Sequence, residues 1–592
     1  MLSFDQILVF VVLLFILISL YREILGPAFT FLVGVIVLGI FGILTPTEIL
    51  KGFGNEQIAV ILLLLLIGDV IRRTAVVEVI FDRLFKSARS YRGFLSRMTL
   101  LISGFSAFLN NTPLVAVMIP YVHSWCRRNN ISPSKFMIPL SYAAILGGSA
   151  TLIGTSTNLI VNGLVVDQTI IPDLESLKIF DFVAVGLPMI IIGWLYLMLF
   201  GEKLLPDRQD ALTQFSLGKR EYLVEAKVRE KSPLIGKTIE DAGLRHQPGF
   251  HIVEIWRRGY QITVFGADFL LDKGDILIFA GETEAIADMI KSSSGLIIPE
   301  VGMLTRKSRA EVVEVVVSQN STIANKTVRA ANFRSKYDAA IISVHRNGEQ
   351  LKGKIGEVIL RSGDVLLLFT GENFVARTIA TKDFYFISKV REMVKLDWYK
   401  SAALLGGLMV SIILAALNLF PLFLSLLLVL VLSLAMKITQ PRELPGAIDY
   451  NLALIIVLSL ALGTAMIKTG AADLVADGVI RLFAPLDKIG ILAGIYLITT
   501  ILAAYITSKA AAAIIFPIAL QTAVNLQIDP MPFILVTAYA SAANFMTPIG
   551  FQTNLMVYGP GGYSFNDFFK VGAPLTLLYM VVTITILSLI YF

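Results

Sequence analysis

The sequence has little of what soluble enzymes and metal proteins usually carry. Its 592 residues include one cysteine, Cys126, which excludes an internal disulfide, and four histidines that show no metal-ligand spacing. Charged residues make up only 16% of the chain, whereas soluble domains carry about 25%. No Walker-type phosphate loop or catalytic triad is recognisable, and the glycine-rich segment Gly559–Tyr563 is expected to be a loop. These absences argue against an enzyme, an ATP-driven machine and a metalloprotein.

Hydrophobic residues, by contrast, make up 56% of the chain and are concentrated in two blocks. Residues 1–205 and 397–592 are hydrophobic, and residues 206–396 between them are charged and soluble in character. This composition predicts an α-helical polytopic membrane protein in which each outer block is one transmembrane repeat. The first segment lacks a basic leader and a small-residue cleavage site, so we expect a retained transmembrane helix there. The net charge of +6 fits basic cytoplasmic loops better than nucleic-acid binding.

The two outer blocks match each other at an offset of about 396 residues. The matched positions are Gly68–Thr74 with Gly463–Thr469, Pro120 with Pro517, Thr151 with Thr547, and the pair Thr157 and Asn158 with the pair Thr553 and Asn554. Seven basic residues between Arg72 and Arg97 predict a basic amphipathic helix on the membrane surface, whereas Lys468–Lys488 has three basic and three acidic residues. Because basic residues favour the cytoplasmic side, we expect the repeats to be inverted, with a binding site near the membrane midplane.

Four polar or glycine- and proline-rich segments interrupt the apolar runs, namely Asn110–Pro113, Gly147–Asn158, Thr507–Lys509 and Thr547–Asn554. They predict re-entrant hairpins and broken helices. Backbone polar groups cannot stay unpaired in lipid, so such breaks must line a protein or water cavity, where half-helix ends can hold ions. Lys509 takes the position that Thr112 has in the other repeat. A lysine can snorkel to the membrane interface, but the alanines around Lys509 favour a cavity and therefore an anionic substrate.

The middle block contains a second internal repeat. Ser232–Gly259 matches Ser321–Gly348, and the Gly-Asp pairs at Gly274 and Gly363 are 89 residues apart. Alternating apolar stretches with Gly-Asp turns predict a tandem pair of small α+β domains, over residues 206–305 and 306–396. Their basic content favours a cytoplasmic location.

The residues of the hydrophobic blocks resemble the divalent anion/sodium symporter family, which includes sodium-coupled sulfate and dicarboxylate carriers. The resemblance rests on the segments FLNNTPLVAVMIP, GTSTNLI, SKAAAAIIFP and TPIGFQTNLMVYG. It implies a homodimeric elevator transporter with a scaffold domain and a moving transport domain. The middle pair resembles the RCK C-terminal regulatory domain of potassium-conductance regulators, which implies a regulatory role and an unknown ligand.

That family carries a Ser-Asn-Thr triplet at each of two hairpin tips, which here become Asn110 to Thr112 and Thr507 to Lys509. Lys509 departs from the pattern, and Ala503 offers no hydroxyl where Ser106 does in the first repeat, which puts the second sodium site in doubt. The resemblance implies substrate contacts from Asn110, Asn111, Thr112, Thr157, Asn158, Thr507, Ser508, Lys509, Thr553 and Asn554. It implies sodium contacts from Ser106, Asn110, Asn111 and Gly154. The plainer alternatives are polar packing between helices and capping of the broken helices.

The sequence therefore predicts a multi-pass carrier of the inner (plasma) membrane that imports a small divalent oxyanion with sodium as coupling ion and no other cofactor or metal. Sulfate is the first candidate, because Lys509 and the following alanines imply a small charged pocket, and a C4-dicarboxylate is the second. An alternative of another class is an anion sensor or a ligand-gated channel controlled by the middle domains. A potassium channel is disfavoured because no TVGYG-like filter is present.

Overall fold

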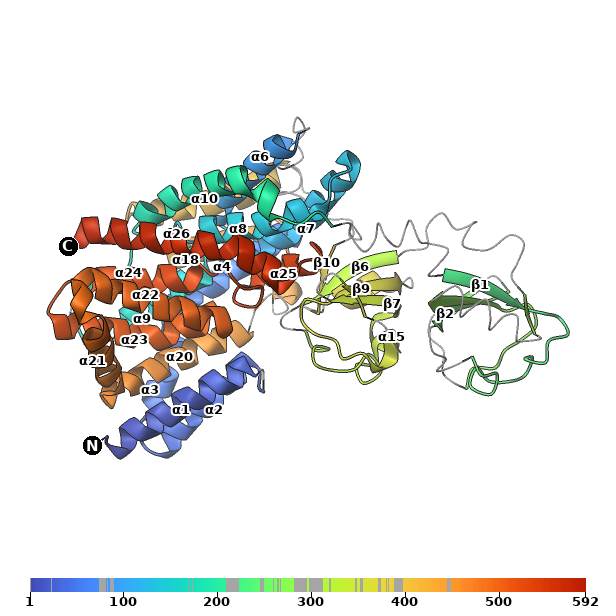
Figure 1. Ribbon diagram of the computed structural model, residues 1–592, viewed down its shortest axis with the longest axis horizontal. Coiled ribbons are helices and arrows are strands. Elements are labelled where there is room, and N and C mark those ends of the chain that lie inside the picture. Colours follow the sequence, from blue (N-terminus) through green and yellow to red (C-terminus); the bar gives the residue numbers. More distant parts are fainter. Residues whose placement is uncertain are drawn as a thin grey trace.

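The architecture comes from a computed structural model. It describes residues 2–592 except 23, 74–80, 82–83, 86–89, 169, 173, 209–222, 245–249, 259, 263–265, 267, 282–294, 298–311, 319–320, 347–348, 352–354, 371–373, 380, 382, 388–397, 445–447 and 449. A helical bundle occupies one end of the molecule and two small β-sheets occupy the other (Figure 1). The boundaries predicted at 305/306 and 396/397, and much of the basic surface helix predicted after Arg72, lie outside the described residues.

The two hydrophobic blocks form corresponding series of helices. The first block contains α1 (Phe4–Tyr21), α2 (Pro27–Ile40), α3 (Pro46–Lys51), α4 (Glu56–Arg73), α6 (Tyr91–Ser106), α7 (Asn111–Asn129), α8 (Met137–Gly148), α9 (Ser156–Asp167) and α10 (Val183–Leu204). The second contains α17 (Trp398–Ala416), α18 (Leu422–Ala435), α20 (Tyr450–Lys468), α21 (Ala471–Phe483), α22 (Asp487–Tyr505), α23 (Ser508–Leu526), α24 (Met531–Ala542), α25 (Gln552–Tyr558) and α26 (Phe565–Tyr591). The order α6–α10 is thus repeated as α22–α26.

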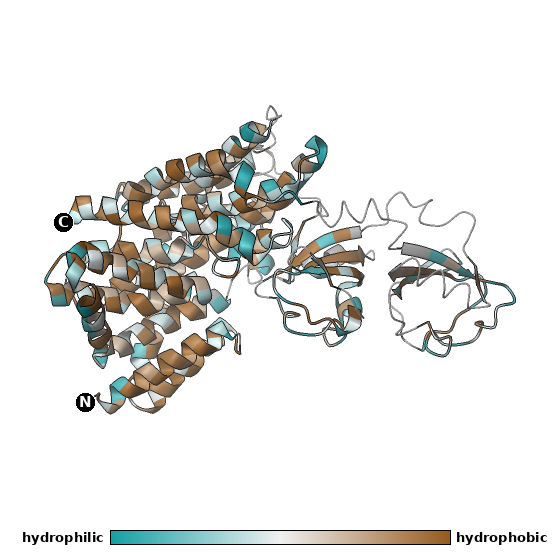
Figure 2. Cartoon of the chain, in the orientation of Figure 1, coloured by the Kyte–Doolittle hydropathy of each residue, from teal (hydrophilic) through white to brown (hydrophobic). Residues whose placement is uncertain are grey.

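The bundle has the length and composition of a membrane-spanning unit. Six of the described helices are long and apolar enough to cross a membrane, and up to eight spans result if each of two bent helix pairs counts as one. The helices of the bundle consist mostly of hydrophobic residues (Figure 2), and many large apolar side chains lie on their outward faces. On α26, Leu577, Val581 and Leu589 are 63%, 54% and 82% exposed. Leucine and valine on an outer face are stable when lipid covers them, so the predicted polytopic membrane fold is confirmed.

All four predicted interruptions separate helices. The chain breaks between α6 and α7, between α8 and α9, between α22 and α23, and between α24 and α25. The halves interlock at these breaks, because α25 packs against α7 and α8, while α9 packs against α23 and α24. Buried tyrosines reinforce the exchange. The hydroxyl of Tyr142 on α8 donates to the Phe545 carbonyl at 2.7 Å, and that of Tyr539 on α24 donates to the Phe182 carbonyl at 2.7 Å.

The middle block forms two antiparallel five-stranded sheets with strand orders β3-β2-β4-β1-β5 and β10-β6-β9-β7-β8. The strands of the first are β1 (Leu223–Val228), β2 (Phe250–Arg257), β3 (Tyr260–Ile262), β4 (Ile276–Gly281) and β5 (Leu296–Ile297). Those of the second are β6 (Val312–Val317), β7 (Ala339–Arg346), β8 (Glu349–Gln350), β9 (Val365–Thr370) and β10 (Phe384–Phe386), with the short helix α15 (Phe333–Tyr337) beside them.

The sheets carry the same internal ion pair, which supports the 89-residue repeat. Arg257 donates from Nε and Nη2 to both oxygens of Asp275 at 2.8 Å, and Arg346 does the same to Asp364 at 2.7 Å. Each aspartate is the residue after the glycine of a Gly-Asp turn, and each is almost fully buried. Bidentate pairing satisfies a buried carboxylate, so the turn and the strand before it are fixed together in both copies.

The two sheets also pack on each other. Val253, Ile278 and Ala280 of the first share an apolar cluster with Ile342 and Leu367 of the second, among others. In addition, a ring nitrogen of His251 lies 2.8 Å from the Ile341 carbonyl oxygen. The pair is therefore a single packed unit, whose first copy is the one farther from the bundle in Figure 1.

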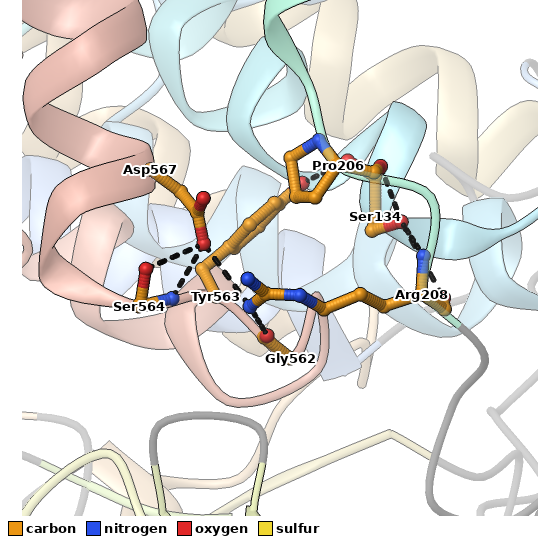
Figure 3. A network of polar contacts seen from close by, with 7 residues as sticks. All are labelled: Ser134, Pro206, Arg208, Gly562, Tyr563, Ser564 and Asp567. Atoms are coloured by element: carbon orange, nitrogen blue, oxygen red, sulfur yellow. Dashed lines mark hydrogen bonds and ion pairs between the residues drawn. The ribbon is translucent and has the colours of Figure 1, made fainter.

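The segment that leaves α10 toward the sheets is tied to the loop between α25 and α26 (Figure 3). The Arg208 guanidinium donates to the Gly562 carbonyl and lies 3.0 Å from the carboxylate of Asp567. The backbone N–H of Arg208 donates to the Ser134 hydroxyl at 2.9 Å, and the Tyr563 hydroxyl donates to the Ser134 carbonyl. This cluster fixes the point at which the chain leaves the bundle toward the two sheets, close to both α8 and α25.

Candidate functional site

The two hairpin tips are capped helix N-termini. The side chain of Asn110 accepts from the backbone N–H of Thr112 at 3.2 Å and starts α7. The hydroxyl of Thr507 accepts from the backbone N–H of Ala510 at 3.2 Å and starts α23. Each cap satisfies one of the first-turn N–H groups, and the helix dipole leaves partial positive charge at both ends. The predicted triplets therefore lie where an anion is electrostatically favoured.

The middle residue of each triplet binds the break of its own repeat. The amide orientation of Asn111 that fits the surrounding hydrogen-bond donors and acceptors is the one in which its nitrogen donates to the Gly154 carbonyl at 3.1 Å. The hydroxyl of Ser508 donates to the Gly550 carbonyl at 3.1 Å. These contacts occur at equivalent positions of the two repeats, so the hairpin tip and the break between the half-helices form one unit in each half.

Oxygen atoms are concentrated around the first of these units. The Ser106 hydroxyl donates to the Ala144 carbonyl at 2.8 Å and lies 2.6 Å from the Asn111 amide. The carbonyl oxygens of Ser106 and Gly148 crowd Gly154, where an added Cβ would lie 2.9 and 2.6 Å from them. Ser106 and Asn111 are 0% and 2% exposed. Several buried carbonyl and side-chain oxygens at short range are the donor set that a hard monovalent or divalent cation prefers.

The second unit is built differently. Asn544 takes the place of Gly148, and its amide nitrogen donates to the Ala503 carbonyl at 2.6 Å. The Thr547 hydroxyl donates to the Ala504 carbonyl at 3.1 Å. The Thr151 hydroxyl makes the matching contact with the Ala107 carbonyl in the first half, so the halves differ in the Asn544 amide, which occupies the Ala503 carbonyl oxygen. The second half therefore offers fewer oxygen ligands than the first, in line with the missing hydroxyl at position 503.

Lys509 lies in the first turn of α23, directly after Ser508, and is partly buried. It stands near the N-terminal end of a helix long and apolar enough to span a membrane, next to Ser508, which contacts the break. Thr112, its counterpart on α7, is also partly buried.

The predicted residues of α9 and α25 are buried and hold the breaks in shape. Asn158 and Asn554 each donate from their amide nitrogen to a carbonyl seven residues earlier, at 2.9 and 3.0 Å. The side-chain oxygen of Asn554 accepts from the Ser141 hydroxyl at 2.7 Å, whereas that of Asn158 is buried and accepts no hydrogen bond from the described residues. Thr553 accepts from Ser141 at 2.8 Å, and Thr157 is 1% exposed. Their role toward a ligand stays a prediction.

One contact at the first tip could not be anticipated from the motifs. The Thr112 hydroxyl donates to the side-chain oxygen of Gln552 at 3.2 Å, and the Gln552 amide nitrogen donates to the hydroxyl of Tyr385 at 2.8 Å. Gln552 is the first residue of α25, and Tyr385 lies on β10 of the second sheet. The only signal in the sequence was the position of Gln552 beside Thr553 and Asn554.

A cavity separates the first tip from α4. It encloses about 280 Å³, including space open to solvent, and apart from Asn110 its lining is apolar or glycine. The lining residues are Gly68, Ile71, Leu109, Asn110, Pro113, Leu114 and Val117. Within the described part of the chain, no group of three histidine, cysteine or acidic residues could hold a metal ion.

Comparison with known proteins places the chain in a family. A family model described as citrate transporter matches residues 12–427 and 409–592. The chain is 34% identical to a putative sulfur deprivation response regulator of Chlamydomonas reinhardtii, over 93% of this chain and 96% of that one. It is 32% identical to an uncharacterized transporter of Synechocystis, over 98% and 96%. It is 24% identical to sodium/sulfate cotransporter 1 of Chlamydomonas reinhardtii, over 94% and 86%.

These matches extend over both helical blocks and the sheets between them. They confirm the predicted kinship with carriers of divalent anions and the prediction that the chain is not an enzyme. The similarity of the sheets to RCK C-terminal domains stays a prediction. By its fold, its capped tips and its match along almost the whole sequence, the chain belongs to the citrate transporter family of secondary membrane transporters.

Proposed function

We propose that the protein is a sodium-coupled symporter that imports a small divalent oxyanion, with sulfate as the first candidate. The observation that carries the proposal is the pair of capped N-termini, α7 and α23, each bonded to the break of its own repeat through Asn111 or Ser508. Relatives named sodium/sulfate cotransporters support both the ion and the anion.

The anion would be held by charge and by hydrogen-bond donors. The N-termini of α7 and α23 supply partial positive charge and unpaired N–H groups. Lys509 adds a full positive charge, which neutralises half of a dianion. Hydroxyl donors come from Thr112 and Thr507. Sulfate fits the small side chains after Lys509, whereas a C4-dicarboxylate needs a second cationic or N–H contact several ångströms away and is therefore the second candidate.

Sodium would occupy the oxygen-rich unit of the first repeat. The carbonyl oxygens of Ser106 and Gly148 crowd Gly154, and the side chains of Ser106 and Asn111 lie beside them. Asn110 belongs to this group through its cap position on α7. Each co-transported charge that crosses 100 mV releases about 2.3 kcal/mol, so sodium entry can drive uptake of an anion against its gradient.

The resemblance supplies the mechanical part of the proposal. The protein would work as a homodimer in the inner (plasma) membrane, with the sheets in the cytoplasm. The interlocked elements α7 to α9 and α23 to α25 would move together as the transport domain of an elevator. The lining between the tip of α7 and α4 supports this division, because apart from Asn110 it consists of apolar residues and glycine, which make no directional bonds that sliding would have to break.

The test is uptake into proteoliposomes that contain the purified full-length protein. Radiolabelled sulfate, succinate and citrate are compared, each with and without an inward sodium gradient. Accumulation of sulfate above equilibrium that depends on sodium is expected. Preferred uptake of succinate or citrate would show that this acid, rather than sulfate, is the substrate. Uptake that does not depend on sodium would reject the proposed coupling.

A second candidate function is an anion sensor. One relative is named a putative sulfur deprivation response regulator, and the sheets contact the predicted site through Tyr385. A sensor would bind sulfate in a thermal-shift assay, yet it would show no uptake under any gradient.

A further inference from the structure

Within the described part of the chain, the Gly-Asp turn of the second sheet domain contacts the bundle closely and the equivalent turn of the first domain does not, although the domains are repeats. Gly363 has a φ of +89° in its Gly-Asp turn, and an added Cβ would lie 2.9 Å from Leu555 of α25. Its counterpart Gly274 has a φ of +79° and nothing within 4 Å in the described part of the chain. The same turn is therefore buried against the transporter in one copy and open in the other.

The contact extends to the end of α25. An added Cβ at Gly559 would lie 2.8 Å from the Gly363 carbonyl oxygen and 2.4 Å from Cγ2 of Val365. Val365 and Val316, on neighbouring strands of the second sheet, belong to the apolar core of the bundle rather than to that of the sheet domain. This is a built interface, because glycine is needed on both sides for the backbones to approach so closely.

Tyr385 connects the same interface to the predicted substrate site. The side chain of Gln552 spans the gap, since it binds Tyr385 with its amide nitrogen and Thr112 with its oxygen. The residue that corresponds to Tyr385 in the first domain, by its pairing with the neighbouring strand, is Ile297, which has no hydroxyl. The polar connection is thus a property of the second domain alone.

We propose that the second sheet domain is an inhibitory latch on the substrate site and that Tyr385 is its positioning residue. Tyr385 fixes the Gln552 amide, and the fixed amide oxygen accepts the proton that the Thr112 hydroxyl would donate to an anion. At the same time, the Gly363 turn holds α25 against the domain. Release of the latch frees the Thr112 donor and lets α25 move. The inference rests on the proposed function for the identity of the anion, but not for the contact.

The first experiment closes the latch covalently. An ideal Cβ at Gly559 lies 3.8 Å from Cβ of Val365, the mean separation in disulfides. The double variant Val365→Cys with Gly559→Cys is therefore expected to form a disulfide on oxidation. The natural Cys126 is buried and should not compete for either new thiol. Sulfate uptake should fall to that of empty liposomes and return on reduction. The same double variant kept reduced is the control, because the new Cβ at Gly559 also presses on the Gly363 carbonyl and the effect of that contact must be separated from the effect of the disulfide. Failure to cross-link, or full uptake by the cross-linked protein, would overturn the latch.

The second experiment opens the latch with the smallest possible change. Tyr385→Phe removes only the hydroxyl that holds Gln552. The expected result is a fall in the KM for sulfate of about 2- to 10-fold, the range that one hydrogen bond supports. Tyr337→Phe is the matched control, because its hydroxyl binds Asp383 at 2.6 Å inside the same domain. A purely structural role would change thermal stability in both variants and KM in neither.

A readout without transport separates the latch from the proposed function. The sulfate concentration that gives half of the maximal thermal stabilisation is measured for the wild type, Tyr385→Phe and Tyr337→Phe. A lower value for Tyr385→Phe alone supports the latch even if the wild type shows no uptake, which would reject the symporter. Equal values in all three proteins reject the latch, even if the wild type accumulates sulfate.

Discussion

Gly148→Ala is the sharpest test of the sodium site, because the glycine faces a proposed ligand directly. An added Cβ at Gly148 would lie 2.4 Å from the amide nitrogen of Asn111 and 2.6 Å from its oxygen, in the orientation in which that nitrogen donates to Gly154. Ordinary van der Waals contact begins at 3.4 Å. The difference of the two distances, 3.4 minus 2.4, is 1.0 Å, so the amide has to retreat by about that much.

The size of the effect follows from the hydrogen bonds that the retreat breaks. The Asn111 amide nitrogen lies 3.1 Å from the Gly154 carbonyl and 3.3 Å from the Ala144 carbonyl. Both contacts exceed hydrogen-bond length after a shift of about 1 Å. A hydrogen bond contributes about 0.5–1.5 kcal/mol, so two of them correspond to about 1–3 kcal/mol, or roughly a 5- to 100-fold loss of affinity. The sodium concentration for half-maximal sulfate uptake should rise by this factor.

The assay is the sodium dependence of initial sulfate uptake in proteoliposomes. Gly104→Ala is the matched control, since Gly104 lies on α6 and an added Cβ there meets nothing within 4 Å in the described part of the chain. It should leave the sodium dependence unchanged. If Gly148→Ala folds, as judged by size-exclusion chromatography, and keeps the sodium dependence of the wild type, Asn111 does not hold the coupling ion.

Two further predictions concern charge. Lys509→Ala should raise the KM for sulfate at least roughly 10-fold, because it removes a charge-assisted contact of about 1.5–3 kcal/mol. Lys509→Thr should also raise the sodium concentration needed for half-maximal uptake. Normal uptake by Lys509→Ala would show that the amine does not contact the anion. Burial lowers the pKa of His251 to about 4 from 6.5. Between pH 6.5 and pH 4 the unfolded chain therefore binds a proton at His251 that the folded sheet pair does not bind. The protein loses stability as the pH falls through that window. The free energy of unfolding should fall by about 2 kcal/mol between pH 7.5 and pH 5, as measured by thermal unfolding of the full-length protein, and this loss should be smaller in His251→Gln. An unchanged pH dependence in this variant would assign the effect to other groups, such as His345, whose pKa burial also lowers.

The helical framework and its breaks were predictable because their signals are local. Polar residues in an apolar run, as at Asn110 and Thr507, cap helices wherever the chain re-enters from a turn. The internal repeat supported each predicted break independently, because the equivalent positions Gly154 and Gly550 both lie in a predicted break. The 89-residue repeat of the Gly-Asp turns likewise predicted two similar domains, and the structure has two sheets with the same Arg–Asp pair.

The contacts across the site were not predictable, because they depend on how distant segments dock. The Thr112–Gln552 contact joins residues 440 positions apart, and no periodicity within either segment encodes it. Tyr385 sat in a block whose pattern predicts a separate soluble domain, so nothing pointed to its hydroxyl bond with α25. The resemblance also named Asn554 as a substrate ligand, whereas its amide nitrogen and oxygen both bind protein groups in this arrangement. Side-chain type alone does not reveal whether an asparagine faces a ligand or its own break.

The difference between the two halves fits the proposed coupling of an anion to a single cation. A perfectly symmetric site would present the same groups twice and would therefore offer two equivalent cation positions beside the anion. Here the asparagine of the first half is on the hairpin, as Asn111, and faces glycine at position 148, whereas in the second half the hairpin has Ser508 and the asparagine is at position 544. The exchange leaves the carbonyl oxygens of Ser106 and Gly148 close together around Gly154, whereas in the second half the Asn544 amide donates to the Ala503 carbonyl. Lys509 extends that trend, because an amine beside such donors favours an anion and repels a second sodium ion. We therefore expect the symporter to bind one sodium ion in the first half and to use the lysine where a symmetric relative would use another.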